Sequence, residues 1–142
     1  MTTAGSTVAT PSRTVDLFLD AIAAGGGVPG GLFSPDAVLD ATVPGWRFAV
    51  RGMDAVARQY SDWFADPAIL EELDRFPVVG REVVSYLLSW VERGVPHAAH
   101  HCHLLRFDRE GRIAGDRFFC GGRWDARLLA EMAAARDAGR GE

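Results

Sequence analysis

Cysteines and long apolar runs are scarce in this sequence. It has two cysteines in 142 residues, Cys102 and Cys120, which fall on neighbouring expected strands but out of register and on opposite faces. A disulfide is therefore not expected, and this is typical of a reducing compartment, so we expect a cytoplasmic protein. No apolar run approaches the roughly 20 residues that span a bilayer, and the first residues lack the charged and apolar regions of a signal peptide. We expect no membrane partner.

Clustered positive charge is also missing. The formal net charge is -4, and acidic residues interrupt the arginines between residues 109 and 123. Nucleic-acid modules usually carry a basic face, so we expect no nucleic-acid partner. With 48% hydrophobic and 24% charged residues, the chain fits one globular domain around a single core. We place this domain at residues 12–138, after a disordered tail at residues 1–11 that lacks apolar periodicity.

Apolar periodicity predicts the order of the helices and strands. A helical spacing begins at Pro11 and ends at the glycines of residues 25–27. A strand at 37–43, with a short continuation at 46–50, precedes a second helix at 52–65. The rest of the chain is β-rich until Asp125 begins a last helix, and strands are expected at 70–79, 82–92, 97–107 and 112–124.

Histidines gather on the strand that begins at His97. In an extended chain successive side chains point to opposite faces, so His101 and His103 share one face with Leu105, while His100 lies on the other face. Imidazoles that line a cavity can transfer protons near neutral pH or bind a metal. This face is therefore the first candidate for a functional surface.

Three segments of the chain resemble the nuclear transport factor 2-like superfamily. They are Leu32–Val38 before the first strand, Arg51 and Gly52 at the second helix, and Leu105–Ile113 at the last hairpin. The resemblance covers residues 12–125 and implies an α+β fold: a cone-shaped, curved antiparallel sheet wrapped over N-terminal helices, as in cystatin-like barrels, with a short C-terminal helix. The superfamily includes ketosteroid isomerases, SnoaL-like polyketide cyclases, scytalone dehydratase, limonene epoxide hydrolase and binding modules, so the fold leaves the function open.

The ketosteroid isomerase pattern, laid on the last hairpin, implies a catalytic pair. It puts His103 where that family has a buried carboxylic acid, and Asp116 directly opposite on the next strand, unless a bulge at Gly111 replaces Asp116 by Arg117. A carboxylate that accepts a proton from one ring nitrogen fixes the tautomer and leaves the other nitrogen for a ligand. Asp40 falls near the family's general base, although the apolar alternation of its strand competes for the inward side.

Aromatic side chains predict a pocket for an apolar or aromatic ligand. The residues expected to line it are Phe18, Trp46, Tyr60, Trp63, Tyr86, Trp90, Phe118 and Cys120. Gly121-Gly122 permits a close backbone approach or a bulge, after which Arg123 and Trp124 would close the mouth of the cone. Phe18 replaces the oxyanion tyrosine of the isomerases, which argues against steroid isomerisation. The catalytic array of limonene epoxide hydrolase falls on Trp90, Leu88 and Phe118, which argues against epoxide hydrolysis.

The leading hypothesis is an enzyme of the SnoaL or ketosteroid isomerase type that needs no cofactor. It would isomerise, dehydrate or cyclise an apolar substrate that carries a carbonyl group. His103 would polarise the substrate oxygen, Asp116 would orient His103, Asp40 would act as the base and His101 would assist. A homodimer is expected through the outer face of the sheet. One alternative is a small-molecule binding module without catalysis, and another is a metal-dependent enzyme that uses His101, His103 and Cys120.

Overall fold

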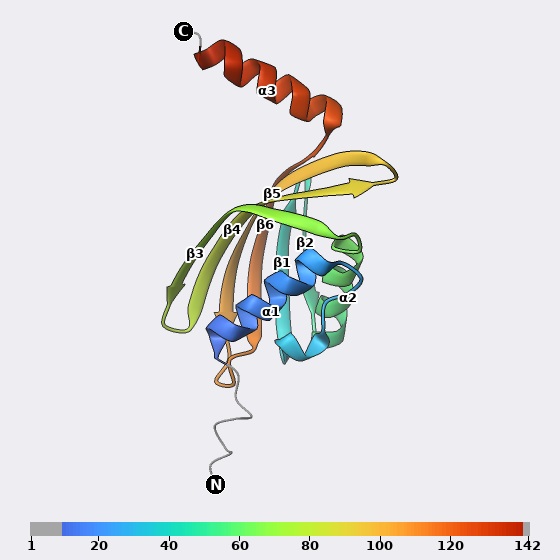
Figure 1. Cartoon of the computed structure of the whole chain (residues 1–142). Helices are drawn as coiled ribbons and strands as arrows, with labels where there is room; N and C mark the ends of the chain where they lie inside the picture. The colour runs from blue at the N-terminus through green and yellow to red at the C-terminus, as the bar shows by residue number, and fades with distance from the viewer. Residues whose placement is uncertain (1–9, 141–142) are drawn as a thin grey trace.

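The computed structural model describes residues 10–140 (Figure 1). Residues 1–9 of the predicted tail lie outside this range, whereas Pro11, which the prediction also assigned to the tail, begins the first helix. Helix α1 is Pro11–Ala24, and its N-terminus is capped by the Thr10 hydroxyl, which accepts from the backbone N–H of Arg13 at 3.2 Å. The predicted apolar stripe of α1 is buried, and Gly25 ends the helix with φ at +72°.

Six strands form one curved sheet in the order β2-β1-β6-β5-β4-β3. A single 3-10 turn, η2 (Gly30–Leu32), leads into β1, and α2 (Met53–Trp63) follows β2. The strands are β1 (Phe33–Val43), β2 (Trp46–Arg51), β3 (Ala68–Val78), β4 (Arg81–Glu92), β5 (Val95–Phe107) and β6 (Ile113–Asp125). The α+β prediction is confirmed, with one correction: the sheet is mixed, because β6 returns to the centre and pairs in parallel with β1. Alternation within a strand carries no information on the direction of its neighbour.

Helices α1 and α2 cover the concave side of the sheet, which wraps around them (Figure 1). The core lies between these layers and includes Phe18 from α1, Tyr60 from α2 and Leu39, Tyr86 and Phe118 from the sheet. Helix α3 (Ala126–Arg140) follows β6 directly and projects away from the body, touching β5 and β6 at its base. Among the described residues, no helix is long and apolar enough to cross a membrane.

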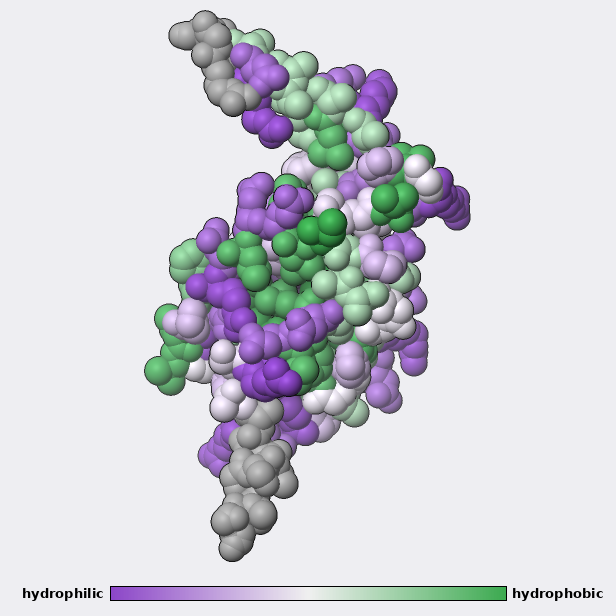
Figure 2. Space-filling model, viewed as in Figure 1, coloured by the Kyte–Doolittle hydropathy of each residue, from purple (hydrophilic) through white to green (hydrophobic). Residues whose placement is uncertain are grey.

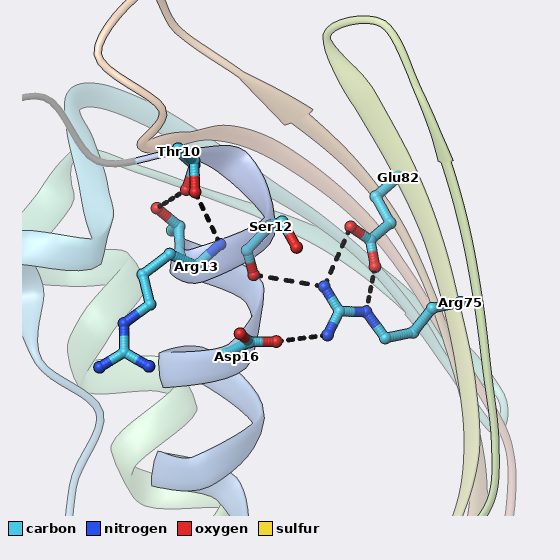
Figure 3. A network of polar contacts seen from close by, with 7 residues as sticks. Thr10, Ser12, Arg13, Asp16, Arg75 and Glu82 are labelled. Carbon is cyan, nitrogen blue, oxygen red and sulfur yellow. Dashed lines mark hydrogen bonds and ion pairs between the residues drawn. The ribbon is translucent and has the colours of Figure 1, made fainter.

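An arginine on β3 joins the sheet to α1 (Figure 3). The guanidinium of Arg75 donates from Nε to the Glu82 carboxylate at 2.5 Å, from Nη1 to Asp16 at 2.5 Å and from Nη2 to the Ser12 carbonyl at 3.3 Å. Glu82 is 1% exposed, so its charge depends on this partner. The carboxylates hold the pKa of Arg75 above its usual value, Glu82 first among them. The contact closes α1 against the β3–β4 side of the cone.

Candidate functional site

A cavity of about 230 Å³ opens at the end of the sheet where β6 runs into α3. Most of its wall is apolar. Figure 2 shows hydrophobic surface gathered near the middle of the molecule on the side toward the viewer, below the base of α3. The apolar wall is formed by Phe48, Trp63, Phe64, Leu88, Trp90 and Phe118. Three polar side chains also line it: His101, Cys120 and Arg123. Such a pocket suits a small, flat, mostly apolar molecule.

Strand β5 carries two histidines toward the helices, as its alternation predicts. His101 is 7% exposed and His103 is fully buried, whereas His100 is exposed on the opposite face. Of the two, only His101 lines the pocket, and the ring of Phe118, which also lines it, lies 4.8 Å from each histidine ring. His103 is therefore a buried group behind the pocket wall.

The buried polar side chains form one hydrogen-bonded chain behind that wall. His103 Nδ1 lies 2.6 Å from Asp116 Oδ2, and Tyr60 donates its hydroxyl to the same oxygen. The second ring nitrogen, Nε2, lies 2.8 Å from the Tyr86 hydroxyl, which in turn lies 3.2 Å from His101 Nδ1. The chain therefore runs without a break from Tyr60 and Asp116 to the histidine of the pocket wall.

Asp116 Oδ2 accepts from the Tyr60 hydroxyl, and with this oxygen as the acceptor at one end the directions of the other hydrogen bonds in the chain follow. The same oxygen accepts from His103 Nδ1–H, so the Nε2 of a neutral His103 accepts from the Tyr86 hydroxyl. The Tyr86 oxygen then accepts from His101 Nδ1–H. His101 Nε2 is left as an acceptor. It makes no hydrogen bond with the described residues, and it is not fully buried. It is therefore open to the pocket.

The electrostatic environment keeps the members of the chain in these states. Burial, with a smaller contribution from His103, lowers the pKa of His101 to about 3, so its imidazole is neutral at physiological pH. Burial, followed by the charge of Asp116, raises the pKa of Tyr60 and of Tyr86 well above the ordinary value, so both phenols keep their protons. The two tyrosines can pass a proton on but do not ionise.

One oxygen of Asp116 is left over. Oδ2 accepts both hydrogen bonds, while Oδ1 is buried and has no partner among the described residues. A buried carboxylate oxygen without a partner is costly, and such groups concentrate at functional sites rather than in ordinary cores. This is an independent sign that the chain serves more than packing.

The structure divides the predicted site residues into three groups. His101, Trp63, Trp90, Phe118 and Cys120 line the pocket. His103, Asp116, Tyr60, Tyr86 and Phe18 lie behind it in the core, where Phe18 meets the His103 ring edge-on at 5.4 Å. For Phe18, Tyr60 and Tyr86 this corrects the prediction of ligand contact, because the two helices and β4 pack these rings around His103 and away from the cavity.

Asp40 and Trp46 belong to neither group. Asp40 lies on the outer face of β1 in an exposed bidentate pair with Arg47, at 3.0 and 2.8 Å. The buried alternation of Leu39 and Ala41 takes the inward side, so the prediction of Asp40 as the base is corrected. Trp46 is 69% exposed where β2 begins, and it does not line the pocket.

The contact between His103 and Asp116 arises from a register other than the predicted one. His103 stands opposite Phe118, and Asp116 stands opposite Leu105. The two partners are therefore diagonal neighbours on one face, which long side chains can bridge. One residue of the shift arises at the turn, where Phe107 pairs with Ile113, and a second arises from the irregularity between Arg106 and Phe107; the sequence alone locates neither.

The predicted metal set does not converge. Both ring nitrogens of His103 are engaged, by Asp116 and by Tyr86, which leaves no lone pair for a metal. Within residues 10–140, no three histidine, cysteine or acidic side chains form a cluster that could hold a metal ion. Burial also raises the pKa of the Cys120 thiol, which disfavours the thiolate that a metal requires.

Seven lining residues were not among the predicted site residues: Val43, Pro44, Phe48, Phe64, Leu88, Ala99 and Arg123. Two of them carry a signal in the sequence. Phe64 follows Tyr60 by four residues at the end of α2, and Leu88 alternates with Tyr86 and Trp90 on β4. Arg123 was expected at the mouth of the cone, without an assigned role.

Comparisons with known proteins identify the fold of this chain. No protein-family model matches the chain, and no curated protein matches it in sequence. Solved structures do match. An NTF2-like protein from Anabaena variabilis has a TM-score of 0.69 at 11% identity, over 86% of this chain and 94% of that one. A protein with a ketosteroid isomerase-like fold from Catenulispora acidiphila, in complex with trimethylamine, has a TM-score of 0.58 at 17% identity, over 78% and 85%.

A third matching structure is an epoxide hydrolase-like relative in fold only. The LEH-like epoxide hydrolase of M. tuberculosis has a TM-score of 0.61 at 14% identity, over 78% of this chain and 81% of that one. Identities this low establish the architecture and leave the chemistry open. The chain therefore has the nuclear transport factor 2-like fold, which resembles those of ketosteroid isomerase-like and cystatin-like proteins, as its sequence segments predicted.

Proposed function

We propose that this protein is a cofactor-independent acid–base enzyme that moves a proton on a small apolar ketone, as in isomerisation or dehydration. The observation that carries the proposal is the unbroken hydrogen-bonded chain from Asp116 to His101, whose Nε2 opens to an aromatic pocket. The base that meets the substrate is His101, and the two residues first predicted as the catalytic pair act behind it. His103 and Asp116 are positioning and proton-storing residues in this scheme.

The proton moves in three coupled transfers. His101 Nε2 takes a proton from the carbon next to the substrate carbonyl, which leaves an enolate. His101 gives its Nδ1 proton to the Tyr86 oxygen, and Tyr86 gives its own hydroxyl proton to His103 Nε2. His103 is then an imidazolium beside the Asp116 carboxylate, which offsets the new charge. The reverse sequence returns a proton to another carbon of the enolate and completes an isomerisation.

The low pKa of His101 is the reason for a relay. With a pKa of about 3, an imidazolium at His101 is not a stable resting place for a proton at neutral pH. Transfer to His103 puts the positive charge next to the only carboxylate in the hydrogen-bonded chain. A wall residue that stays neutral, with the charge stored deeper, suits an apolar substrate better than a charged wall.

The test uses hydrogen–deuterium exchange of 2-indanone, a small cyclic ketone, in D2O. Binding is read from the fluorescence of the pocket tryptophans Trp63 and Trp90, and exchange at the carbons next to the carbonyl is read by mass spectrometry. The protein should accelerate exchange over buffer at matched pH. His101→Ala should abolish the acceleration, and Tyr86→Phe should lower it about a hundredfold or more, because it breaks the relay while keeping the ring.

Asp40→Asn is the matched control, since its carboxylate lies outside the cone and exchange should be unchanged. Binding of 2-indanone with exchange no faster than in buffer would refute catalysis and favour the binding module. Failure of 2-indanone to bind at all would refute the ligand class. Exchange that survives in His101→Ala would refute the assignment of the base.

We also propose that the chain pairs with a second copy through the outer face of the sheet. Three exposed or half-exposed apolar side chains lie there: Phe76 on β3, Leu104 on β5 and Phe119 on β6, which are 58%, 37% and 37% exposed. Val83 of β4 stands between Phe76 and Leu104 in the register. Exposed apolar groups that are contiguous across strands are typical of interfaces. The arrangement leaves the pocket, on the other side of the sheet, open in both copies.

A further inference from the structure

Arg123 brings a permanent positive charge to a pocket whose other polar side chains are neutral. The pKa of His101 is lowered to about 3 and that of the Cys120 thiol is raised by burial, so neither carries a charge at neutral pH. Arg123 lines the same cavity from the end of β6. The pocket therefore has a neutral interior and one cationic group.

A β-bulge turns Arg123 toward the cavity. Cys120 stands opposite His101, and Arg123 stands opposite Ala99, so three steps along β6 match two steps along β5. The extra residue falls at Gly121-Gly122. Without it, simple alternation from Phe118 and Cys120 would bring residue 122 to the inner face and leave Arg123 outside. The two glycines thus re-aim a charged side chain at the pocket, which is a common use of bulges beside functional sites.

Contacts at the mouth hold the guanidinium in place. Its Nη2 donates to Glu92 Oε1 at 2.5 Å, and its central carbon lies 5.6 Å from the centre of the Trp90 ring. Trp90 itself lines the pocket and stacks on His97 at 5.5 Å. The Arg123 side chain is 53% exposed and Glu92 binds it through one oxygen, so part of the guanidinium remains available to a second anion.

We propose that the pocket selects a one-ring aromatic monoanion: a carboxylate held by Arg123 and a hydroxyl or enolisable ketone held at His101. This rests on the proposed function and narrows its substrate class: the part of the substrate that meets His101 is apolar, and the charge lies at the other end, at Arg123. Arg123 faces Ala99, two residues before His101, so the two residues start from backbone positions about 7 Å apart along the strand and reach the same cavity from different ends. A cavity of about 230 Å³ suits a small aromatic molecule of this kind.

A matched pair of ligands tests the charge alone. 4-Hydroxybenzoate and 4-hydroxybenzamide have nearly the same shape, and each can donate its phenol to His101. Their affinities are compared by tryptophan fluorescence, and the readout is the ratio of the two dissociation constants within each variant. The wild type should prefer the benzoate about threefold to tenfold, because the ion pair is partly exposed, and 0.5 M KCl should reduce the preference.

Three variants decide the outcome. Arg123→Gln should abolish the preference, and Glu92→Gln should increase it by releasing the guanidinium. Arg127→Gln removes another arginine charge, in the first turn of α3, where Arg127 pairs with Glu131, and should leave the ratio unchanged because Arg127 does not line the pocket. Equal binding of the two ligands, a preference that survives in Arg123→Gln, or binding of neither ligand would overturn the inference. Each of these results is independent of 2-indanone exchange, which tests the proposed function separately.

Discussion

At the scale of residues, His101 is the only member of the buried polar chain that meets the pocket. Everything behind it serves to fix its tautomer: Asp116 orients His103, His103 orients Tyr86, and Tyr86 holds His101 Nδ1. A neutral imidazole in an apolar wall is costly to protonate, and that cost must appear in the stability of the whole protein.

Acid should destabilise the fold through His101. Its pKa is about 3 in the folded protein and 6.5 in the unfolded chain, so between these values only the unfolded state binds the proton. The free energy of unfolding should therefore fall by about 2 kcal/mol from pH 6.5 to 4.5, with a slope that approaches 1.36 kcal/mol per pH unit at the acid end, and should change little through this group above about pH 7.5. Urea denaturation at a series of pH values measures this slope.

His101→Phe provides the comparison, because it keeps an aromatic ring in the same wall and removes the titration. Between pH 6.5 and 4.5 the unfolding free energy of this variant should fall by about 2 kcal/mol less than that of the wild type. Ordinary carboxylates titrate mostly below this window and do not mask the difference. Equal slopes in the two proteins would show that His101 is already protonated in the fold.

At the scale of elements, the site depends on how α1 and α2 are held together above the sheet. Gly25, just after α1, lies against the segment between α2 and β3, where the Gly26 N–H donates to the Ala65 carbonyl at 3.0 Å. This contact fixes the end of α2 from which Tyr60 and Phe64 reach the histidines. The Arg75 contact holds the other side of α1.

Gly25→Ala should be strongly destabilising, by about 3 kcal/mol. A Cβ at this position would lie 2.6 Å from the backbone of Asp66 and of Pro67, and φ is +72°. Gly26→Ala is the matched control: φ is +83°, but no atom lies within 4 Å of its Cβ, so only the conformational cost of about 1 kcal/mol applies. Denaturant unfolding compares the two variants, and similar losses would mean that close packing at Gly25 does not matter.

At the scale of the whole molecule, one sheet serves two surfaces. Its concave side holds the histidines and the pocket, while its outer side exposes apolar groups that the fold itself does not cover. Successive residues of β5 point alternately to the two sides of the sheet, so each residue of the outer face is next in sequence to one of the concave face. The outer face can therefore be tested without entering the pocket.

Leu104→Glu should convert a dimer into a monomer. Light scattering coupled to size-exclusion chromatography measures the mass, and a stable interface needs about 800 Å² from each partner, which a buried charge at its centre disrupts. Leu17→Glu on α1 is the control, because Leu17 is 38% exposed, close to the 37% of Leu104, but lies on another surface. A monomeric wild type, or the same effect from both variants, would contradict pairing through this face.

Particular residues show where prediction from the sequence succeeded and failed. The inward side of His101 and His103 followed from alternation, and the ends of α1 followed from Pro11 and the glycines. The register of β5 against β6 did not follow, because a hairpin irregularity shifts pairing without leaving a clear pattern in the sequence. Asp40 was predicted as a base from its place in the ketosteroid isomerase pattern, although the apolar alternation of its own strand indicated the outer face.

The sequence by itself determined which side chains each strand and helix presents together, because periodicity is a local property of the backbone. It therefore determined the order of elements, the histidine face and the stock of aromatic rings. Only the tertiary structure decided which of those groups meet: β6 lies parallel to β1, Tyr86 bridges two histidines, His103 sits behind the wall, and a bulge turns Arg123 inward. These contacts depend on register and packing between distant segments, which no local pattern encodes.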